Sequence, residues 1–545
     1  MTNPGWTRRG LMASGAALAL TAAACGRKNE GVTRVAKGDA RTLHRGNGAE
    51  PDTIDPHKAS GNWENNIIGD MFIGLMTDAA DATAIYGAAE SMTASADGLV
   101  YTFKLRDHVW SDGKPVTAHD FVFSYRRMAD PKTAAQYASI LYPMKNMQKA
   151  TEGKVAPSEV GARAIDDRTL ELTFDYQVPY LKEMLTHYTC FAVPQHIVEK
   201  HGEQWTRPEN IVCNGPYMLK EWISNDHLRL VKNPKFYDAA NVHIDTVNFY
   251  PTQDSSAALK RFRGGEFDIV TDSVPPAEIN WLKTNMPREL RLSPYILSQY
   301  VQFNMSRKPF TDPRIRKAMS LALDREVLVS RILRAGELAS YSLVPKGIPG
   351  YQSAELAFRK EPMEKRLAEA AQLLAAAGYG PNNPLNFSFN VSNATETRAV
   401  SVAMQGMWSK LSINAKIDNY DSQIHYNMLR KRDFEVTWAG WIADYRDAKN
   451  YLMLFQSGTT DLNYSGYSNP AYDALVDKSD NEHDPAAREV LLRQAEQLLL
   501  DDAVVIPGYQ GVTRNLVSPQ VQGWADNNVN IHRTRHLRLD RERTV

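Results

Sequence analysis

Cysteine is scarce in this sequence: there are three among 545 residues, Cys25, Cys190 and Cys213. No two of them form a Cys-x-x-Cys pair, which excludes zinc-ribbon and thioredoxin-like sites. Cys25 stands apart, directly after an N-terminal apolar run. The other two form one disulfide, as in many exported proteins, or remain buried thiols, and the sequence leaves both alternatives open.

Catalytic motifs are missing as well. The sequence has no Gly-x-Ser-x-Gly elbow, no Gly-x-x-x-x-Gly-Lys phosphate loop and no His-Glu-x-x-His zinc motif. Its 13 histidines are scattered, and residues 378–380, Gly-Tyr-Gly before a proline, are typical of a helix end. We therefore predict a binding protein without catalytic residues, metal or cofactor, and not an enzyme.

An excess of charge of either sign is also absent. The 63 Lys and Arg residues balance 63 Asp and Glu residues, so we predict neither nucleic acid nor an anionic membrane as a partner. The length indicates about three domains. We find no repeat of 20–50 residues and no low-complexity linker. We expect a monomer whose only contact with a membrane is a lipid anchor.

The one long apolar run lies at the N-terminus and predicts export. Twin arginines within residues 7–12 precede the apolar residues 11–24, which end in small side chains before Cys25. This run is too short for a membrane anchor and is typical of a signal peptide. We predict a signal peptide over residues 1–24, a polar leader over 25–39 and a periplasmic or cell-envelope protein. Cys25 is either lipidated after cleavage or left free by an ordinary signal peptidase.

Strands and helices alternate along the rest of the chain. Alternating polarity and short apolar runs predict strands over residues 99–106, 168–174, 385–391 and 503–509. Apolar residues at helical spacing predict helices over residues 313–335, 362–377, 397–411 and 485–500. Thr117 and Asp120 form a capping box at the start of another helix. The pattern favours an α/β fold with mixed sheets, in lobes between which the chain crosses several times.

The stretch from Asp433 to Tyr445 combines a strand with small residues, aromatic side chains and a single following acid, Asp444. Small residues allow another backbone to come close, and aromatic side chains form broad apolar walls. A carboxylate in such surroundings is costly unless a cation or donors meet it. Asp444 therefore caps a following helix, pairs with a neighbouring arginine, or binds the ammonium group of a ligand.

Residues 110–122, Trp-Ser-Asp-Gly-Lys-Pro-Val-Thr-Ala-His-Asp-Phe-Val, resemble the extracytoplasmic solute-binding proteins of peptide ABC transporters. Residues 211–217, 232–237 and 310–318 extend the resemblance, and residues 440–445 resemble the oligopeptide-binding branch. The resemblance implies an α/β, hinged two-lobe periplasmic binding protein of type II, cluster C, with an extra domain. The implied domains are domain I over 40–72, 196–296 and 511–545, domain II over 73–195, and domain III over 297–510.

The resemblance also implies a peptide site, in which Asp444 matches the acid that holds the peptide α-ammonium group. Ligand main chain would pair with protein backbone, which gives affinity without reading the ligand's sequence. The backbone segments implied to pair with the ligand are Ser60, Gly61 and Asn62, and the stretch Ala439, Gly440, Trp441, Ile442 and Ala443. The side chains implied to line the cleft are those of Tyr137, Trp438, Trp441 and Tyr509.

Several positions depart from the family pattern. Trp438 stands where oligopeptide-binding relatives can place an arginine. Other basic residues of relatives fall near Leu429, Leu333 and residues 395–397, and Arg430 and Arg334 lie one residue away from the first two. How the ligand C-terminus is held, and so the preferred peptide length, stays open. Two further apolar residues stand where some relatives link two cysteines, which implies an apolar contact instead. These residues are Leu297 and Ile442.

We therefore predict a receptor that captures oligopeptides and delivers them to an inner-membrane ABC permease with its ATPase. The alternative within the same transport role is a dipeptide, a murein peptide or a peptide-like antibiotic. A hydrolase or a chaperone using the same cleft is the alternative from a different class. We find no Ser-His or Cys-His pairing that supports a hydrolase.

Overall fold

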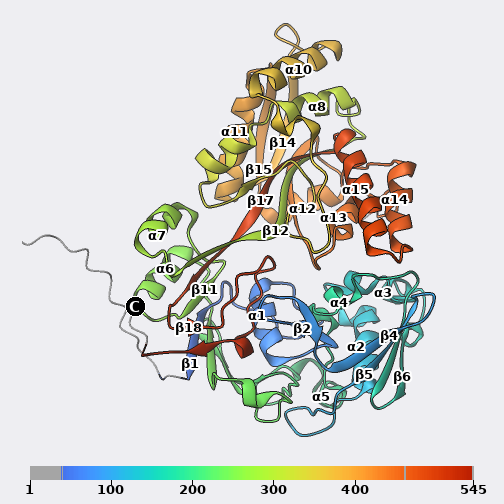
Figure 1. The fold of residues 1–545 in the computed structure, drawn as a ribbon, viewed down its shortest axis with the longest axis vertical. Helices are drawn as coiled ribbons and strands as arrows, with labels where there is room; N and C mark the ends of the chain where they lie inside the picture. Colours follow the sequence, from blue (N-terminus) through green and yellow to red (C-terminus); the bar gives the residue numbers. More distant parts are fainter. Residues whose placement is uncertain (1–38, 40, 460–461, 543–545) are drawn as a thin grey trace, which may run out of the picture.

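The computed structural model describes residue 39, residues 41–459 and residues 462–542. These residues form an upper lobe and a lower lobe, joined on one side by long strands (Figure 1). The export signal predicted over residues 1–24, and Cys25 with it, lies outside the described residues. None of the helices in the described residues combines the length and apolar character that crossing a bilayer requires.

One mixed sheet of eleven strands runs through both lobes, in the order β15-β14-β16-β12-β17-β11-β1-β10-β9-β8, with β13 paired to β17. Its upper-lobe strands are β13 (Leu338–Ala339), β14 (Leu385–Ser392), β15 (Ile413–Tyr420) and β16 (Val436–Ile442). Its lower-lobe strands are β1 (Thr42–Gly46), β8 (Tyr217–Ile223), β9 (His227–Lys232), β10 (Thr246–Tyr250) and β11 (Ile269–Thr271). The strand predicted over residues 385–391 thus lies in this shared sheet, as β14.

Strands β12 (Leu290–Phe303) and β17 (Val505–Val517) connect the lobes. They pair antiparallel, and the register shifts between Pro294 and Ser298 and again between Gln299 and Tyr300. Such irregularities bend a strand pair. The bend lies where the pair passes from β11 of the lower lobe to β16 of the upper lobe. The division into three domains stays a prediction, and this strand pair is the natural place for its hinge.

The lower lobe contains a second sheet and short helices. Its strands follow the order β4-β5-β7-β6, with a separate β2-β3 hairpin. The strands are β2 (Met76–Asp78), β3 (Ala84–Tyr86), β4 (Ala89–Ala94), β5 (Val100–Leu105), β6 (Ala162–Asp166) and β7 (Thr169–Thr173). The helices are α1 (Asn62–Met71), α2 (Ala118–Ala129), α3 (Met147–Thr151), α4 (Leu181–Met184), α5 (Gln195–His201), α6 (Ser255–Arg263) and α7 (Ile279–Asn285). The predicted capping box is confirmed at α2, where Asp120 accepts from the Thr117 N–H at 2.9 Å.

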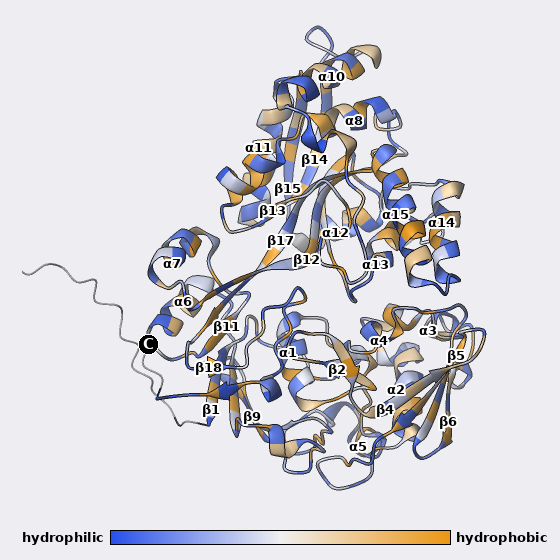
Figure 2. Cartoon of the chain, viewed as in Figure 1, coloured by the Kyte–Doolittle hydropathy of each residue, from blue (hydrophilic) through white to orange (hydrophobic). Residues whose placement is uncertain are grey.

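Helices cover the sheet of the upper lobe, with hydrophilic and hydrophobic residues side by side along them (Figure 2). They are α8 (Pro313–Leu321), α9 (Arg325–Val327), α10 (Met363–Ala376), α11 (Thr395–Ser409), α12 (Ser422–Arg430), α13 (Lys449–Leu452), α14 (Pro470–Asp480) and α15 (Pro485–Asp501). The single helix predicted over 313–335 is wrong. Asp324 caps a new helix, α9, and a π-helical segment follows over Leu328–Leu333. A capping side chain competes with helix continuation, which apolar spacing alone does not reveal.

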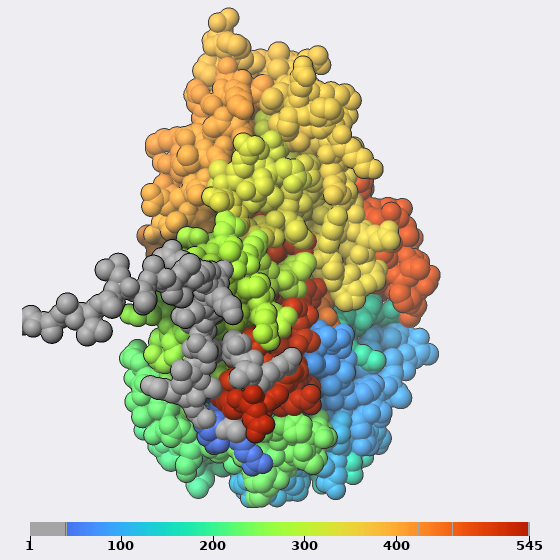
Figure 3. All heavy atoms as spheres, turned by 60° about the vertical axis from the view of Figure 1, so that its left-hand side comes forward, coloured from blue at the N-terminus to red at the C-terminus, as the bar shows by residue number. Residues whose placement is uncertain are grey.

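The apolar residues form separate cores. One fills the lower lobe, and two lie on opposite faces of the upper-lobe sheet, because successive residues such as Trp438 and Ala439 point to opposite faces. The C-terminal segment (red) lies beside the segment that follows the N-terminus (blue) in Figure 3. There Arg533 pairs with Asp78 at 2.8 Å, and Arg45 donates to the His532 carbonyl at 3.0 Å.

Of the two cysteine alternatives, the disulfide is wrong. Cys190 and Cys213 are both free and buried in the lower-lobe core. Burial raises the pKa of both thiols, that of Cys213 to about 12. Because the thiolate is the species that reacts, two such thiols are poor partners for disulfide formation.

Candidate ligand site between the lobes

Strand β16 carries the stretch that ends at Asp444 and leaves one backbone edge open. On one side β12 pairs with it along its whole length, from Val436 to Ile442. On the other side β14 pairs only with Val436 and Thr437. In the described chain no strand pairs with that second edge from Trp438 onward. This edge can accept an extended ligand by strand addition.

Within the part of the chain that the structure describes, Asp444 neither caps the following helix nor pairs with an arginine. The helix that follows is α13, and Asp447, not Asp444, accepts from its Lys449 N–H at 2.9 Å. Asp447 is also the acid that pairs with Arg488, at 2.8 Å. The Asp444 N–H donates to the Asn450 side-chain oxygen at 3.1 Å. This contact fixes the turn, and the Asn450 side chain also hydrogen-bonds to the Asp444 carboxyl group.

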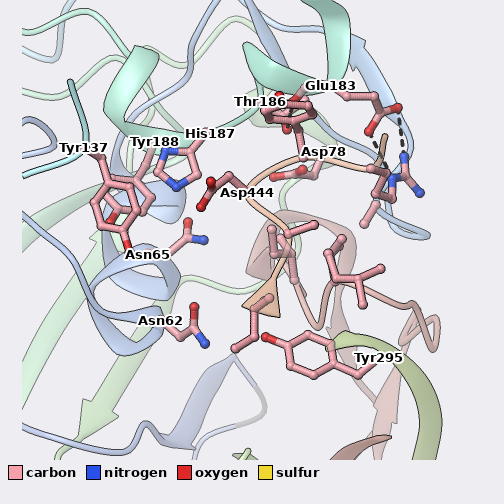
Figure 4. A pocket seen from close by; sticks show the side chains of 18 of the residues that line it. Asn62, Asn65, Asp78, Tyr137, Glu183, Thr186, His187, Tyr188, Tyr295 and Asp444 are labelled. Atoms are coloured by element: carbon pink, nitrogen blue, oxygen red, sulfur yellow. Dashed lines mark hydrogen bonds and ion pairs between the residues drawn. The ribbon is translucent and has the colours of Figure 1, made fainter. Parts of the chain in front are cut away.

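Asp444 lines a cavity of about 310 Å³ between the lobes. In Figure 4, Tyr137, His187 and Tyr188 lie to one side of it, and Asn62 and Asn65 lie nearby. The lower lobe contributes the start of α1 and the segment from α4 to Tyr188, and the upper lobe contributes the end of β16. The lining includes Ser60, Gly61, Asn62, Asn65, Asp78, Tyr137, Glu183, His187, Tyr188, Tyr295, Ala443, Asp444 and Arg446.

Three acids line the cavity, and Asp444 is the one without a cation. Asp78 pairs with Arg533 at 2.8 Å, and Glu183 pairs with Arg446 at 2.9 Å. Among the described residues no ion pair involves Asp444. Burial raises the pKa of its carboxyl to about 6, and the Asn450 amide acts in the opposite direction. The site therefore holds a desolvated negative charge without a positive partner.

The aromatic wall beside Asp444 is uncharged. The His187 ring lies 4.3 Å from that of Tyr188 and 5.6 Å from that of Tyr137, between ring centres. Burial lowers the pKa of His187 to about 3, so its ring is neutral. Burial, and then the charge of Asp444, raise the pKa of Tyr137, which keeps its hydroxyl protonated. The wall can shape a ligand but cannot neutralise the acid.

The backbone groups predicted to pair with a ligand lie just before α1 and in β16, and they already have hydrogen-bonding or strand partners within the protein. The N–H groups of Ser60 and Gly61 donate to Glu64, at 2.9 and 2.6 Å, so they already have partners. Ala439 and Gly440 pair with Tyr300 and Gln299 of β12.

Trp438, Trp441 and Tyr509 are outside the cavity lining. The rings of Trp438 and Tyr509 lie 5.7 Å apart inside one of the two upper-lobe cores. The Trp441 indole N–H donates to Asn450 at 2.7 Å. The structure thus brings Ser60–Asn62, Tyr137, Ala443 and Asp444 together. A ligand role for these three aromatic residues stays a prediction.

Other positions named from the sequence are also located. Leu297 and Ile442 are directly opposed in the β12–β16 pair, which places them as the apolar contact implied by the resemblance requires. Arg430 and Arg334 are exposed and lie outside the lining of the interlobe cavity. Sequence reasoning missed His187, Tyr188 and Tyr295 in the lining. The sequence indicated these residues only weakly, because they lie in short aromatic segments that show neither helical nor strand periodicity.

The comparisons with known proteins agree with this geometry. The model of the bacterial extracellular solute-binding proteins, family 5 Middle, matches residues 83–463. The chain is 36% identical over 522 residues to the periplasmic oligopeptide-binding protein OppA of Salmonella typhimurium, covering 95% of this chain and 96% of that protein.

Two solved structures are similar over nearly their whole length. Haemophilus influenzae OppA, in complex with the peptide RPPGFSPFR, is 33% identical with a TM-score of 0.78, covering 92% of this chain and 99% of that chain. The murein tripeptide binding protein MppA of Escherichia coli is 31% identical with a TM-score of 0.79, with the same coverage.

Proposed function

The chain belongs to the bacterial extracellular solute-binding proteins, family 5, and on this premise we propose that it captures oligopeptides between its lobes and delivers them to an ABC permease. The observation that carries the proposal is Asp444, a desolvated carboxylate in the interlobe cavity without a cationic partner among the described residues. A peptide α-ammonium group supplies that cation through a charge-assisted hydrogen bond. The ligand main chain extends along the open edge of β16.

We expect capture and delivery of the ligand to depend on hinge motion between the two lobes. The lobes separate at the bent β12–β17 pair, a ligand binds Asp444, and closure excludes water and strengthens the charged contact. Relatives named as periplasmic support an extracytoplasmic location. The finer statements, a lipid anchor at Cys25 and a monomeric receptor that meets a permease and its ATPase, are part of the same proposal.

A native mass spectrometry experiment tests this function. The mature protein without Cys25 is unfolded and refolded to remove any ligand, then mixed with di- to hexapeptides, each with a free or an N-acetylated amine. We expect adducts with free-amine peptides and their loss on acetylation or in Asp444→Ala. Unchanged peptide masses after incubation would argue against hydrolysis. If no peptide of any length forms an adduct, the oligopeptide proposal is wrong.

A murein peptide is the second candidate ligand, because the similar structures include a murein tripeptide binding protein. Such a ligand also presents a free amine to Asp444, so comparing free with N-acetylated peptides does not distinguish murein peptides from ordinary oligopeptides. Adding a murein tripeptide to the peptide panel distinguishes them. Selective binding of that compound over ordinary tripeptides would favour this alternative.

A further inference from the structure

A second cavity, of about 380 Å³, lies between the lobes. Its lower-lobe lining includes Gln177 and Pro179, and its upper-lobe lining includes Asp447 and Arg488. No described residue lines both this cavity and the Asp444 cavity. The lobes therefore enclose two separate spaces, although Asp444 and Asp447 are close neighbours in the chain.

An aromatic pair lies where the chain passes from one cavity to the other. In the upper lobe, Tyr445 lines the first cavity and Asp447 lines the second. In the lower lobe, Pro179 lines the second cavity and Glu183 lines the first. Between these positions Tyr180 stacks on Tyr445, with the ring centres 4.5 Å apart and the ring planes 3° from parallel. We call this pair the tyrosine barrier.

The tyrosine barrier is buried and held from both sides. Tyr180 is 4% exposed, and Tyr445, although it follows β16 of the upper lobe, packs in the lower-lobe core at 7% exposure. Beside the first cavity, Arg446 donates two hydrogen bonds to Glu183 across the lobes, at 2.9 and 3.0 Å (Figure 4). Beside the second, the Arg488 guanidinium lies 5.8 Å from the centre of the Tyr180 ring. Stacked rings, a bidentate ion pair and a cation over an aromatic face all stabilise this contact between the lobes.

The amine end of a ligand would point toward this barrier. A ligand that extends along β16 and places its ammonium group at Asp444 directs any substituent of that nitrogen toward the next residues of the chain, Tyr445 and Arg446. Burial raises the pKa of both barrier hydroxyls, so both rings are neutral. The charge of Arg446 is matched by Glu183. The barrier therefore acts on the size of the amine end and not on its charge.

On the basis of the proposed peptide-binding function, we infer that Tyr180 and Tyr445 determine specificity by closing the ligand space behind the amine. A peptide whose terminal nitrogen carries a bulky group is excluded even when that nitrogen keeps its positive charge, because the close-packed rings leave the group no space. Without the barrier the two cavities become one. The second cavity, whose lining includes Tyr101 and Ile348, then accepts an apolar group.

Calorimetry with N-substituted tetrapeptides tests this inference. The peptides are tetraalanines that carry no substituent, a methyl group or a cyclohexylmethyl group on the terminal nitrogen. An alkyl group leaves the amine basic, unlike an acetyl group, so the series changes size at constant charge. For the wild type we expect the methyl peptide to bind within about threefold of the unsubstituted peptide, and the cyclohexylmethyl peptide to bind about 100-fold more weakly.

The variant Tyr180→Ala removes one ring of the barrier. We expect the ratio of the two affinities, unsubstituted over cyclohexylmethyl, to fall from about 100 to less than about 10. Tyr445→Ala should lower the same ratio, so the test does not depend on the folding of one variant. Tyr180→Phe keeps the ring and is the matched control, with the wild-type ratio expected. Tyr237→Ala, at an exposed tyrosine of the lower lobe outside both cavity linings, should also keep that ratio.

Equal binding of the unsubstituted and cyclohexylmethyl peptides by the wild type would overturn the inference and leave the proposed function intact. A wild-type ratio in the folded alanine variants, checked by circular dichroism, would also overturn it, as would loss of the ratio in Tyr180→Phe. If no unsubstituted peptide binds the wild type, the proposed function itself fails, and the inference fails with it.

Discussion

Asp444 and Glu496 are both desolvated carboxylates of the upper lobe, the first half-buried and the second fully buried, and their surroundings differ. Burial raises the pKa of Asp444 to about 6 and that of Glu496 to about 7. Glu496 of α15 accepts hydrogen bonds from Val344 N–H at 2.7 Å, Ala354 N–H at 2.8 Å and the Tyr351 hydroxyl at 2.7 Å. Among the described residues, Asp444 has only the neighbouring Asn450 amide.

The number of hydrogen-bond donors around each carboxylate distinguishes a structural acid from one proposed to bind a ligand. Glu496 joins the loop over residues 343–354 to α15, and its donors all come from the protein, so its function is structural. Asp444 is desolvated as well, but the described residues give it no comparable set of donors, and for this reason we propose that its partner is a ligand. Desolvation alone therefore does not distinguish Asp444 from Glu496, whereas the number of protein hydrogen-bond donors to each carboxylate does.

The largest effect should come from Glu496→Ala. The substitution leaves two backbone N–H groups and a tyrosine hydroxyl buried without an acceptor, which should lower the free energy of unfolding by about 3 kcal/mol or more. Urea unfolding monitored by circular dichroism measures this. Glu489→Ala, on the more exposed part of the same helix, is the control and should change stability by less than about 1 kcal/mol. An equal loss for both variants would contradict the structural role of Glu496.

Asp444→Ala should show the reverse pattern. We expect the affinity for free-amine peptides to fall about 100-fold, because the ammonium group would be buried without its counter-charge. The stability of the ligand-free protein should be unchanged or slightly higher, since a desolvated charge is removed. Calorimetry and urea unfolding of the same preparation measure the two effects. A large loss of stability with little loss of affinity would place Asp444 in the same class as Glu496.

Changing the pH sharpens the comparison further. The folded pKa of Asp444, about 6, lies above its ordinary value of 3.8, so protonation stabilises the ligand-free fold as pH falls through this window. Binding responds in the opposite direction, because the ammonium group needs the carboxylate. Affinity should fall about tenfold for each pH unit below 6. Titration calorimetry between pH 5 and pH 7.5, in wild type and in Asp444→Asn, measures this, and a similar slope in both proteins would exclude Asp444 as its source.

The smallest effect should come from Glu183→Gln. Glu183 lines the same cavity as Asp444, but Arg446 already pairs with it across the lobes, at 2.9 Å. We expect the affinity for free-amine peptides to fall less than about fivefold, with the preference over acetylated peptides retained. Loss of that preference would show that Glu183, and not only Asp444, binds the amine.

Local patterns predicted much of the upper lobe. Strand 385–391 and helices 362–377 and 485–500 match β14, α10 and α15 within a residue or two at each end. Period and capping are properties of neighbouring residues, so a sequence carries them directly. The break after Ala322 was not predicted, because the Asp324 cap competes with an apolar spacing that continues through it.

The site was predictable only in part, and the reason is distance along the chain. The sequence by itself determined that Asp444 follows a strand in apolar surroundings and needs a partner. Only the tertiary structure decided that Arg446 and Arg533 are already paired with Glu183 and Asp78, and that His187 is neutral. Whether a buried charge is satisfied depends on groups hundreds of residues away, and the folded chain alone brings those groups together.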